Sequence, residues 1–588
     1  MENTIWTKTR LLPILLILFS SALFFFDLGK RDLWAPDEPT YAQVAREMWI
    51  SKDFILPHLN GEIYSQKPPL LFWLIILFSL PFGDVTELSA RLPSALAGIG
   101  CMLATFSMGR RFVSNRVGYL AALILPTSAL FLWMSHRVAF DVVLTFFVIM
   151  SLIYFLKGQD RLKAEGGTPQ GGMDKQGLSV SGGHGQTSLS MPPSAFFWLF
   201  YVFLALAVLT KGPAGFIPTF ITILLYLAVQ KKLRLLRKME LGKGFAIFCL
   251  IVFGWVIAAS IKGGHGYMNE ILFRQNIGRF SEPWDHSQPF YYFFINFPLS
   301  FLPWTFFIPG AFIYALFEKE KRREMLFPIL WFAAFFGFFT ISSGKRNIYI
   351  LPLYPAASIM VAWFLDSFVG AGLKPAPTGR VFRWIGYLPG YILYGILLIL
   401  SIALPLYAPR YFHGRGVLLA QRIGESANFF GGQYALTCVS AAGGAILAIV
   451  LLYLKKPLHA LMTTFLFTLL TFSLAKELVI PVINDEKSSK SLCQKASNIM
   501  RTNDVWAIYG FFKPTYLYYT DRNRIEVIQD VSALNSLLAS TNRVLLVIQE
   551  KDFKKVVNEI TSPVHILEKD GVGHRKILLV SNKKVDSR

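Results

Sequence analysis

Long uncharged runs of apolar residues recur along most of the chain, from Leu11 almost to Pro481. Many of them approach the roughly 20 residues that an α-helix needs to cross the hydrocarbon core of a bilayer. The pattern therefore predicts an all-α polytopic membrane domain with about thirteen transmembrane helices. The predicted spans cover residues 11–28, 92–108, 117–134, 138–156, 195–210, 213–229, 244–261, 291–316, 325–341, 348–368, 385–408, 431–454 and 458–481. The shorter run from Pro69 to Phe82 predicts an interfacial or re-entrant helix.

A different pattern begins after residue 483, where short β-rich runs alternate with helical periodicity. Strands are expected at Val505–Tyr509, Arg524–Ile528, Val544–Ile548 and Lys576–Val580, and helices at Val531–Ala539 and Phe553–Ile560. No glycine-rich nucleotide-binding loop accompanies them. We therefore expect a transmembrane domain over residues 1–483 and a small soluble α/β domain over residues 484–588. Residues 158–193, rich in Gly, Ser and Gln, predict a disordered cytoplasmic loop within the first of these.

The composition agrees with a membrane protein, because 54% of the residues are hydrophobic and only 16% are charged, against about 25% charged in soluble chains. Lysines and arginines form short clusters between the apolar runs, such as Arg110–Arg116 and Lys231–Lys238, which is typical of cytoplasmic loops. The net charge of +22 therefore does not indicate a nucleic-acid partner, which requires a contiguous basic surface. We expect a multi-pass protein of the bacterial inner membrane, surrounded by membrane lipids. Its N-terminus is expected in the cytoplasm, and residues 29–90 and the C-terminal domain are expected outside.

With this orientation, many of the ionisable residues gather at the outer ends of the predicted helices, where charged groups at membrane depth are often functional. A carboxylate can orient or deprotonate an acceptor hydroxyl, and a cation can neutralise charge on a phosphate leaving group. The alternative that these are juxtamembrane charges, paired with each other or with lipid headgroups, stays open. The residues are Asp37, Glu38, Arg46, Lys67, His136, Arg137, Asp141, Lys211, Arg274, Arg279, Asp285, His286, Lys345 and Arg346. Asp285 and His286 are the candidates for metal ligation, although no motif has tight ligand spacing.

Several short motifs resemble one family, the lipid A aminoarabinose transferases and related bacterial glycosyltransferases, which are kin of the protein O-mannosyltransferases. The most specific block is Arg31-Asp32-Leu33-Trp34-Ala35-Pro36-Asp37-Glu38-Pro39. The others are Pro57–Gly61, Tyr64 with Lys67-Pro68-Pro69, Ala90–Pro93, Leu209–Pro213, the stretch from Arg279 to Tyr292, and Gly344–Arg346 leading to Tyr349–Pro352.

The resemblance implies the large GT-C membrane glycosyltransferase fold and a polyprenyl-phosphate-linked sugar donor. It implies that Asp37 is the principal catalytic carboxylate, that Asp141 is a second acidic partner, and that Lys67 binds the donor phosphate. Glu38 joins the expected catalytic set, and the remaining expected substrate-binding residues are Tyr41, Tyr64, Arg137, Lys211, Arg279, His286, Lys345 and Arg346. Relatives often carry Glu before the Lys-Pro-Pro motif as a metal ligand, but Gln66 stands here, and a neutral amide is a poor substitute for a carboxylate in binding a divalent cation. The cofactor therefore stays undetermined.

We therefore expect a membrane glycosyltransferase that moves a hexosyl or pentosyl group from a polyprenyl-phosphate donor to lipid A, another envelope glycan or a protein. A lipid or sugar transporter or flippase is the alternative, and it predicts inverted repeats and charged residues near the middle of the membrane. A ligase that transfers oligosaccharides to protein also stays open.

Overall fold

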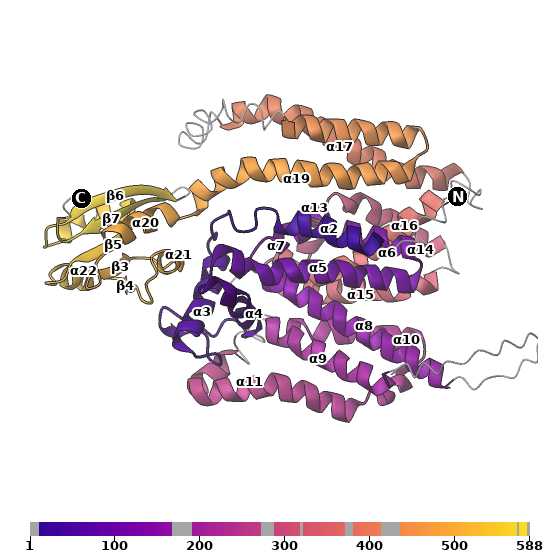
Figure 1. Ribbon diagram of the computed structural model, residues 1–588, viewed down its shortest axis with the longest axis horizontal. Helices are drawn as coiled ribbons and strands as arrows, with labels where there is room; N and C mark the ends of the chain where they lie inside the picture. Colours follow the sequence, from indigo (N-terminus) through magenta and orange to yellow (C-terminus); the bar gives the residue numbers. More distant parts are fainter. Residues whose placement is uncertain are drawn as a thin grey trace, which may run out of the picture.

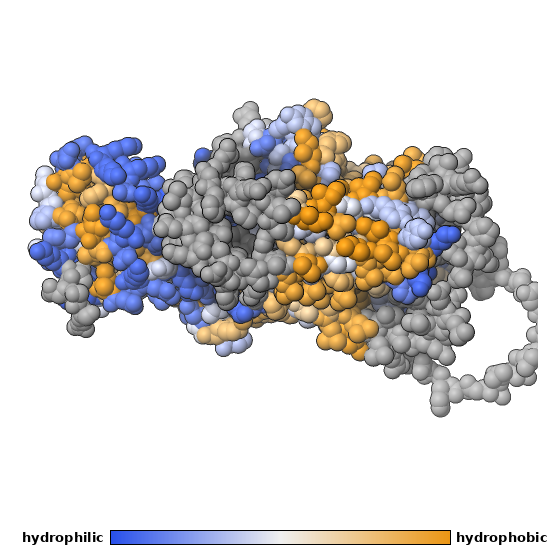
Figure 2. All heavy atoms as spheres, turned by 90° about the horizontal axis from the view of Figure 1, so that it is seen from above, coloured by the Kyte–Doolittle hydropathy of each residue, from blue (hydrophilic) through white to orange (hydrophobic). Residues whose placement is uncertain are grey.

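The computed structural model describes residues 11–166, 191–271, 274, 287–317, 322–370, 380–412, 436–572 and 575–584. A large helical part occupies most of the molecule, and a small sheet domain at one end is formed by the C-terminal residues (Figure 1). Figure 2 shows that the sheet domain is largely hydrophilic on the face in view, whereas apolar residues cover much of the described helical surface. The predicted fold class, a polytopic helical domain with a small C-terminal α/β domain, is confirmed.

The helical part contains eight helices in its described ranges that are long and apolar enough to cross a membrane, or up to ten if each of two bent pairs counts as one span. The predicted number of thirteen spans therefore stays a prediction. The main helices are α2 (Leu11–Phe25), α3 (Asp37–Ser51), α4 (Leu70–Ser79), α5 (Glu87–Phe112), α6 (Asn115–Ile124), α7 (Ala129–Ser135), α8 (Phe140–Gly166), α9 (Pro193–Lys211), α10 (Ile217–Val229), α11 (Leu241–Asn269), α13 (Tyr292–Ser300), α14 (Ile308–Phe317), α15 (Arg322–Ile341), α16 (Tyr354–Gly370), α17 (Arg380–Phe412) and α19 (Pro457–Lys487). A short 3-10 helix, η6 (Asn347–Leu353), precedes α16.

The two bent pairs lie against each other and supply part of the candidate site. The angle is 69° between α6 and α7, and 114° between α13 and the helix that begins at Trp304. At the breaks, the Ala129 amide donates to the Leu302 carbonyl at 2.8 Å, and the Trp304 indole donates to the Thr127 hydroxyl at 3.0 Å. Non-helical backbone at membrane depth needs such partners, because lipid offers none.

Helix α8 extends to Gly166, so the prediction of a disordered loop is wrong for residues 158–166. Two contacts hold this end of the helix. Arg111 forms an ion pair with Asp160 at 2.8 Å. Gly158 lies so close to Phe197 of α9 that a β-carbon there would stand 2.8 Å from the ring. The next residues of the predicted loop, 167–190, lie outside the described ranges.

The C-terminal domain is a five-stranded mixed sheet in the order β4-β3-β5-β7-β6. The strands are β3 (Val505–Tyr509), β4 (Glu526–Ile528), β5 (Val544–Gln549), β6 (His565–Val572) and β7 (Arg575–Ser581). The helices are α20 (Lys490–Ile499), α21 (Thr515–Tyr518), α22 (Val531–Leu538) and α23 (Glu550–Val556). Four strands and the helices α22 and α23 were predicted, whereas α20, α21 and β6 were not. Its charged residues and its irregular register between Ile566 and Glu568 are features of an edge strand, which conceal the alternating pattern.

The sheet domain docks on α3 and the segments beside it, and Arg46 of α3 makes several of the contacts. Arg46 donates to Asp84 at 3.0 and 2.7 Å and to the Tyr518 carbonyl at 2.8 Å, and its guanidinium lies over the Tyr518 ring, 4.3 Å from the centroid. Asn60 and Ile525 exchange two hydrogen bonds of 3.0 and 2.8 Å across the same junction. The domain thereby holds the segment that carries the predicted acidic pair, and Figure 1 shows α3 at the end of the helical part nearest to the sheet.

Candidate functional site

Asp37 opens helix α3, and both of its carboxylate oxygens accept hydrogen bonds. Arg346 donates to Oδ2 at 3.1 Å, and the hydroxyl of Tyr41 donates to Oδ1 at 3.4 Å. The side chain of Asp37 is 30% exposed and that of Arg346 is 35% exposed, so the pair faces an accessible space. Burial, together with the nearby charge of Asp37, raises the pKa of Tyr41 well above its usual range, so Tyr41 is a hydrogen-bond donor at neutral pH.

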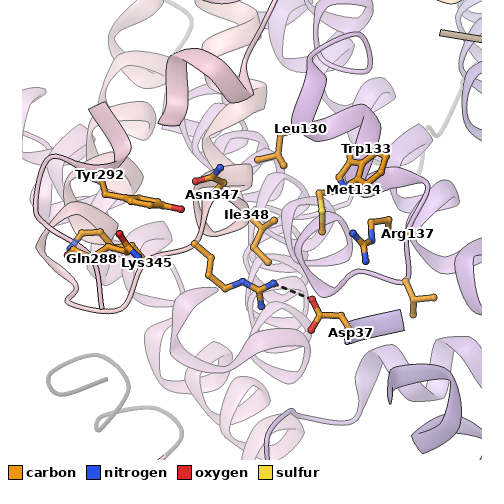
Figure 3. A pocket seen from close by; sticks show the side chains of 12 residues that line it. Asp37, Leu130, Trp133, Met134, Arg137, Gln288, Tyr292, Lys345, Asn347 and Ile348 are labelled. Carbon is orange, nitrogen blue, oxygen red and sulfur yellow. Dashed lines mark hydrogen bonds and ion pairs between the residues drawn. The ribbon is translucent and has the colours of Figure 1, made fainter. Parts of the chain in front are cut away.

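A cavity of about 390 Å³ opens beside Asp37. Figure 3 shows Asp37 at one side of it, with Trp133 and Arg137 nearby and with Gln288, Tyr292 and Lys345 across it. The wall combines an apolar part from α7 with polar groups from the segments that precede α13 and η6. The lining residues are Asp37, Leu130, Trp133, Met134, Arg137, Val138, Gln288, Tyr292, Lys345, Arg346, Asn347 and Ile348.

Three of the lining residues are cations, and they are held differently. Lys345 is 4% exposed, and its ammonium donates to the backbone carbonyls of Ser342 and Gln288. Arg137 lies 3.9 Å from a Glu38 oxygen and 5.6 Å from the Trp133 ring centroid. Arg346 has Asp37 as its recorded side-chain partner. Three cations and one carboxylate therefore give this cavity a net positive charge, which favours an anionic group.

Glu38 follows Asp37 in sequence but faces the protein interior, where it is fully buried. It accepts hydrogen bonds from Arg31 at 2.6 and 2.8 Å, from Arg91 at 3.0 Å, and from the backbone amides of Trp34 at 3.1 Å and Val138 at 3.2 Å. Burial alone would raise the pKa of Glu38, but the charges of Arg91, Arg31 and Arg137 outweigh it and hold that pKa far below its usual range. Glu38 is therefore an ionised carboxylate at neutral pH, and it does not line the cavity.

Asp141 and Lys211 form a second buried ion pair, between α8 and the end of α9. Lys211 also lies over the ring of Tyr349, with its ammonium 4.3 Å from the centroid. Arg137 stands four residues before Asp141 in sequence but approaches Glu38 instead. Neither member of the pair is among the residues that line the cavity.

The other predicted site residues are spread around this centre or fall outside the described ranges. Tyr41 packs edge-on against Phe140 at 4.8 Å, and Tyr64 packs against Phe72 at 6.1 Å. Lys67 is half-buried and Gln66 is exposed in the loop before α4, and neither lines the cavity. The predicted residues Arg279, Asp285 and His286 lie outside the described residues. In the parts of the chain that are described, no group of three or more His, Cys, Asp or Glu side chains could hold a metal ion.

Several lining residues escaped the sequence analysis because they carry no charge. Trp133, Gln288, Tyr292 and Asn347 are aromatic or amide side chains in segments dominated by aromatic and apolar residues. Gln288 and Tyr292 lie within the quoted stretch from Arg279 to Tyr292, but no role was predicted for either. The signal for Trp133 and Asn347 was proximity in sequence to Arg137 and Arg346. Arg31 and Arg91 were quoted within the motifs, but their role around Glu38 was not predicted.

Comparison with known proteins identifies the class to which this fold and site belong. Residues 9–265 match the family described as dolichyl-phosphate-mannose-protein mannosyltransferase. The crystal structure of ArnT from Cupriavidus metallidurans bound to undecaprenyl phosphate superposes with a TM-score of 0.76 at 20% identity, over 97% of this chain and 98% of that one. The fold is thus that of the GT-C membrane glycosyltransferases, and the protein is an integral protein of the inner membrane.

Relatives by sequence define the family more closely. An uncharacterised protein of Aquifex aeolicus is 31% identical over 68% of this chain and 69% of its own length. The undecaprenyl phosphate-alpha-4-amino-4-deoxy-L-arabinose arabinosyl transferase 2 of Proteus mirabilis is 29% identical, and the match spans 60% of this chain and 59% of the transferase. The chain belongs to the family of lipid A aminoarabinose transferase-like membrane glycosyltransferases. This confirms the resemblance found in the sequence.

Proposed function

We propose that this glycosyltransferase moves a sugar from a polyprenyl-phosphate donor to an acceptor at the outer face of the inner membrane. The observation that carries the proposal is Asp37, a partly exposed carboxylate in a cavity that also presents Arg137, Lys345 and Arg346. The related transferases are named for an undecaprenyl-phosphate-linked donor, which supports the same kind of carrier here. In this proposal the N-terminus is cytoplasmic and the C-terminal domain lies outside.

The proposed reaction is a direct displacement with inversion at the anomeric carbon. The acceptor oxygen attacks C1 of the sugar, the bond from C1 to the phosphate oxygen breaks, and its electron pair stays on the departing polyprenyl phosphate. If the acceptor is a hydroxyl, its proton passes to Asp37 as general base. If the acceptor is a phosphate, it is already ionised, and Asp37 orients it without taking a proton.

The cations have a separate role in this proposal. The leaving phosphate gains negative charge as the C1–O bond breaks, so a guanidinium or ammonium beside it stabilises the transition state more than the bound donor. Arg346 and Arg137 line the cavity, and we assign them to this charge together with Lys67 from the neighbouring loop. Lys345 is bound to two carbonyls and shapes the loop that presents Arg346.

Glu38 is assigned to positioning, because its oxygens are occupied by buried donors and it lies away from the cavity lining. Asp141 keeps its proposed place as the second acid of the site. Its pairing with Lys211 supports a role in fixing the wall beneath η6, which packs against α8.

Reconstituted protein tests the proposal directly. Proteoliposomes receive a polyprenyl phosphate carrying a radiolabelled sugar, either a pentose or a hexose, together with lipid A or a peptide as acceptor. We expect polyprenyl phosphate and a labelled acceptor to form in equal amounts. Movement of intact donor across the bilayer without cleavage of its C1–O bond contradicts the proposal and supports a transporter. The donor and acceptor that give turnover identify the sugar class and the acceptor class, and mass spectrometry of lipid A and secreted glycoproteins from a deletion strain checks them in the cell.

A further inference from the structure

One arginine in the cavity can pair with either of two anionic groups. Arg346 is hydrogen-bonded to Oδ2 of Asp37, yet the transfer reaction also brings a phosphate into this cation-lined cavity. On the basis of the proposed function, we propose that Arg346 exchanges Asp37 for the phosphate of the bound donor, so that donor binding uncovers Oδ2 of Asp37 for the acceptor. Arg346 would then couple donor binding to exposure of the base.

The oxygen that Arg346 covers is the one an acceptor needs. Oδ1 of Asp37 accepts from Tyr41, whose hydroxyl belongs to the buried side of α3. Oδ2 accepts from Arg346, which lies on the cavity wall. A carboxylate oxygen has a second lone pair, but the guanidinium of Arg346 occupies the cavity side of Oδ2, from which an acceptor in the cavity would approach. Movement of Arg346 opens this side of Oδ2 to the acceptor.

Arg346 is also the cavity cation that is least restrained by neutral or structural partners. Lys345 is 4% exposed and donates to two backbone carbonyls. Arg137, with a side chain 19% exposed, lies against Glu38 and Trp133. The side chain of Arg346 is 35% exposed, and an ion pair at this exposure contributes little net stability. A phosphate can therefore compete for its guanidinium, which matches phosphate oxygens as well as it matches a carboxylate.

The backbone around Arg346 allows the side chain to move alone. Its carbonyl accepts from the Tyr349 amide at 2.9 Å, which fixes it at the start of η6. The preceding turn is joined to the segment before α13, where the Gln288 amide donates to the Ser343 carbonyl at 3.2 Å. Exchange of partners thus requires rotation of one long side chain and no rearrangement of either loop. Tyr41 still holds the released carboxylate in place.

Exchange of partners has a thermodynamic signature that other arrangements lack. If Arg346 must leave Asp37 to bind phosphate, the free energy needed to break the Arg346–Asp37 pair reduces its contribution to phosphate binding. Removing the charge of Asp37 abolishes that loss, so Arg346 contributes more to binding in an Asp37→Asn protein than in the wild type. If Arg346 bridges both anions, or never contacts phosphate, its contribution is equal or smaller in Asp37→Asn.

The test measures equilibrium binding of radiolabelled undecaprenyl phosphate to four purified proteins in lipid nanodiscs: wild type, Arg346→Gln, Asp37→Asn and the double variant. We expect Arg346→Gln to weaken binding at least about fivefold more in the Asp37→Asn background than in the wild type, near the lower end of usual coupling between sites. An equal or smaller effect in Asp37→Asn overturns the inference. Because binding is measured without turnover, this outcome leaves the proposed function standing.

Two controls keep the result interpretable. Arg137→Gln removes a cavity cation that is not paired with Asp37, and its effect on binding should be the same in both backgrounds within about twofold. If Arg346→Gln does not yield folded protein, Arg346→Lys is compared in the same two backgrounds with the same sign expected, because Lys keeps the charge and loses the planar fork. Absence of saturable binding to the wild type contradicts the proposed donor class and this inference with it.

Discussion

Arg91 donates from Nε to Oε1 of Glu38 at 3.0 Å, and both side chains are completely buried. The same carboxylate binds Arg31 from the segment before α3 and the Val138 amide between α7 and α8. Glu38 therefore ties three segments together, and one of them carries Arg137. Asp37, the preceding residue in the chain, is held beside that segment by its neighbour Glu38.

Replacing Glu38 by Gln should destabilise the protein strongly. The change leaves Arg31 and Arg91 buried without a counter-charge, and breaking a buried pair in this way costs about 3–5 kcal/mol. We expect a clear fall in the thermal unfolding temperature in detergent, and transfer activity that is lost in proportion to folded protein. Glu62→Gln, an exposed change in the same loop, should alter the stability by no more than about 0.5 kcal/mol. A Glu38→Gln protein of wild-type stability would contradict the role of Glu38 as the counter-charge of Arg31 and Arg91.

The same carboxylate should dominate the acid limit of stability. The pKa of Glu38 is depressed in the folded protein, with burial opposing the shift and Arg91 and Arg31 causing it. Its stabilising contribution is therefore complete above the unfolded value, about 4.3, and is lost as the pH falls below it. Thermal unfolding measured from pH 7 to pH 3 should show the difference between wild type and Glu38→Gln shrinking below about pH 4. A stability difference that grows as the pH falls would mean that the pKa of Glu38 is not lowered in the folded protein.

Asp141 and Lys211 should behave as a coupled pair. Asp141→Asn or Lys211→Met alone leaves one charge in a buried position, which we expect to destabilise the protein by about 3 kcal/mol or more. The double variant removes both charges. Its loss of unfolding free energy should therefore be smaller than the sum of the two single losses by at least about 1 kcal/mol. Activity separates the remaining roles: a double variant that folds but does not transfer sugar supports Asp141 as the second acid, and recovered activity shows that the pair is structural.

Arg46 should control how firmly the C-terminal domain docks. Its side chain joins Asp84, Val85 and Tyr518 in one interface. Arg46→Ala removes the Arg46 donor from the buried Tyr518 carbonyl, while the Val85 carbonyl keeps the Tyr518 hydroxyl as donor. Arg46→Lys cannot reproduce the fork or the ring contact. In both variants, the rate of hydrogen exchange in α21 and in the loop before α5 should rise at least about tenfold. A rise of this size corresponds to a decrease of about 1.4 kcal/mol or more in the free energy of local opening. Unchanged exchange in these segments would show that other contacts fix the domain.

The acidic site could be predicted from sequence because its strongest signal is local. The block from Arg31 to Pro39 contains Asp37, Glu38 and Arg31 together, whereas the orientation inferred from the charged loops stays a prediction. What sequence did not separate was the function of two adjacent acids. Successive helical residues point about 100° apart, so Asp37 faces the cavity and Glu38 the interior, and both positions lie in the same proline-flanked turn.

Long-range partners were the harder part. Arg137 stands four residues before Asp141, but α8 begins only at Phe140, so the two residues do not lie on one helical face. The partner of Asp141 is Lys211, which comes from another helix. Arg346 and Asp37 are 309 residues apart in sequence, and only the family motifs placed both in one site. Gln288 and Tyr292 lie within one of the family motifs, but nothing in the sequence assigned a role to these neutral side chains or to Asn347.

The central claim is that Asp37 acts on the acceptor in the transfer reaction. Its most direct test is the rate of sugar transfer from a lipid-linked donor by Asp37→Asn protein in proteoliposomes, with Glu62→Gln as the matched acidic control. With a hydroxyl acceptor, we predict that kcat falls by at least about 100-fold, in line with loss of a general base, while folded protein and binding of undecaprenyl phosphate are retained. Transfer by Asp37→Asn at a rate within a few fold of the wild type would contradict the account.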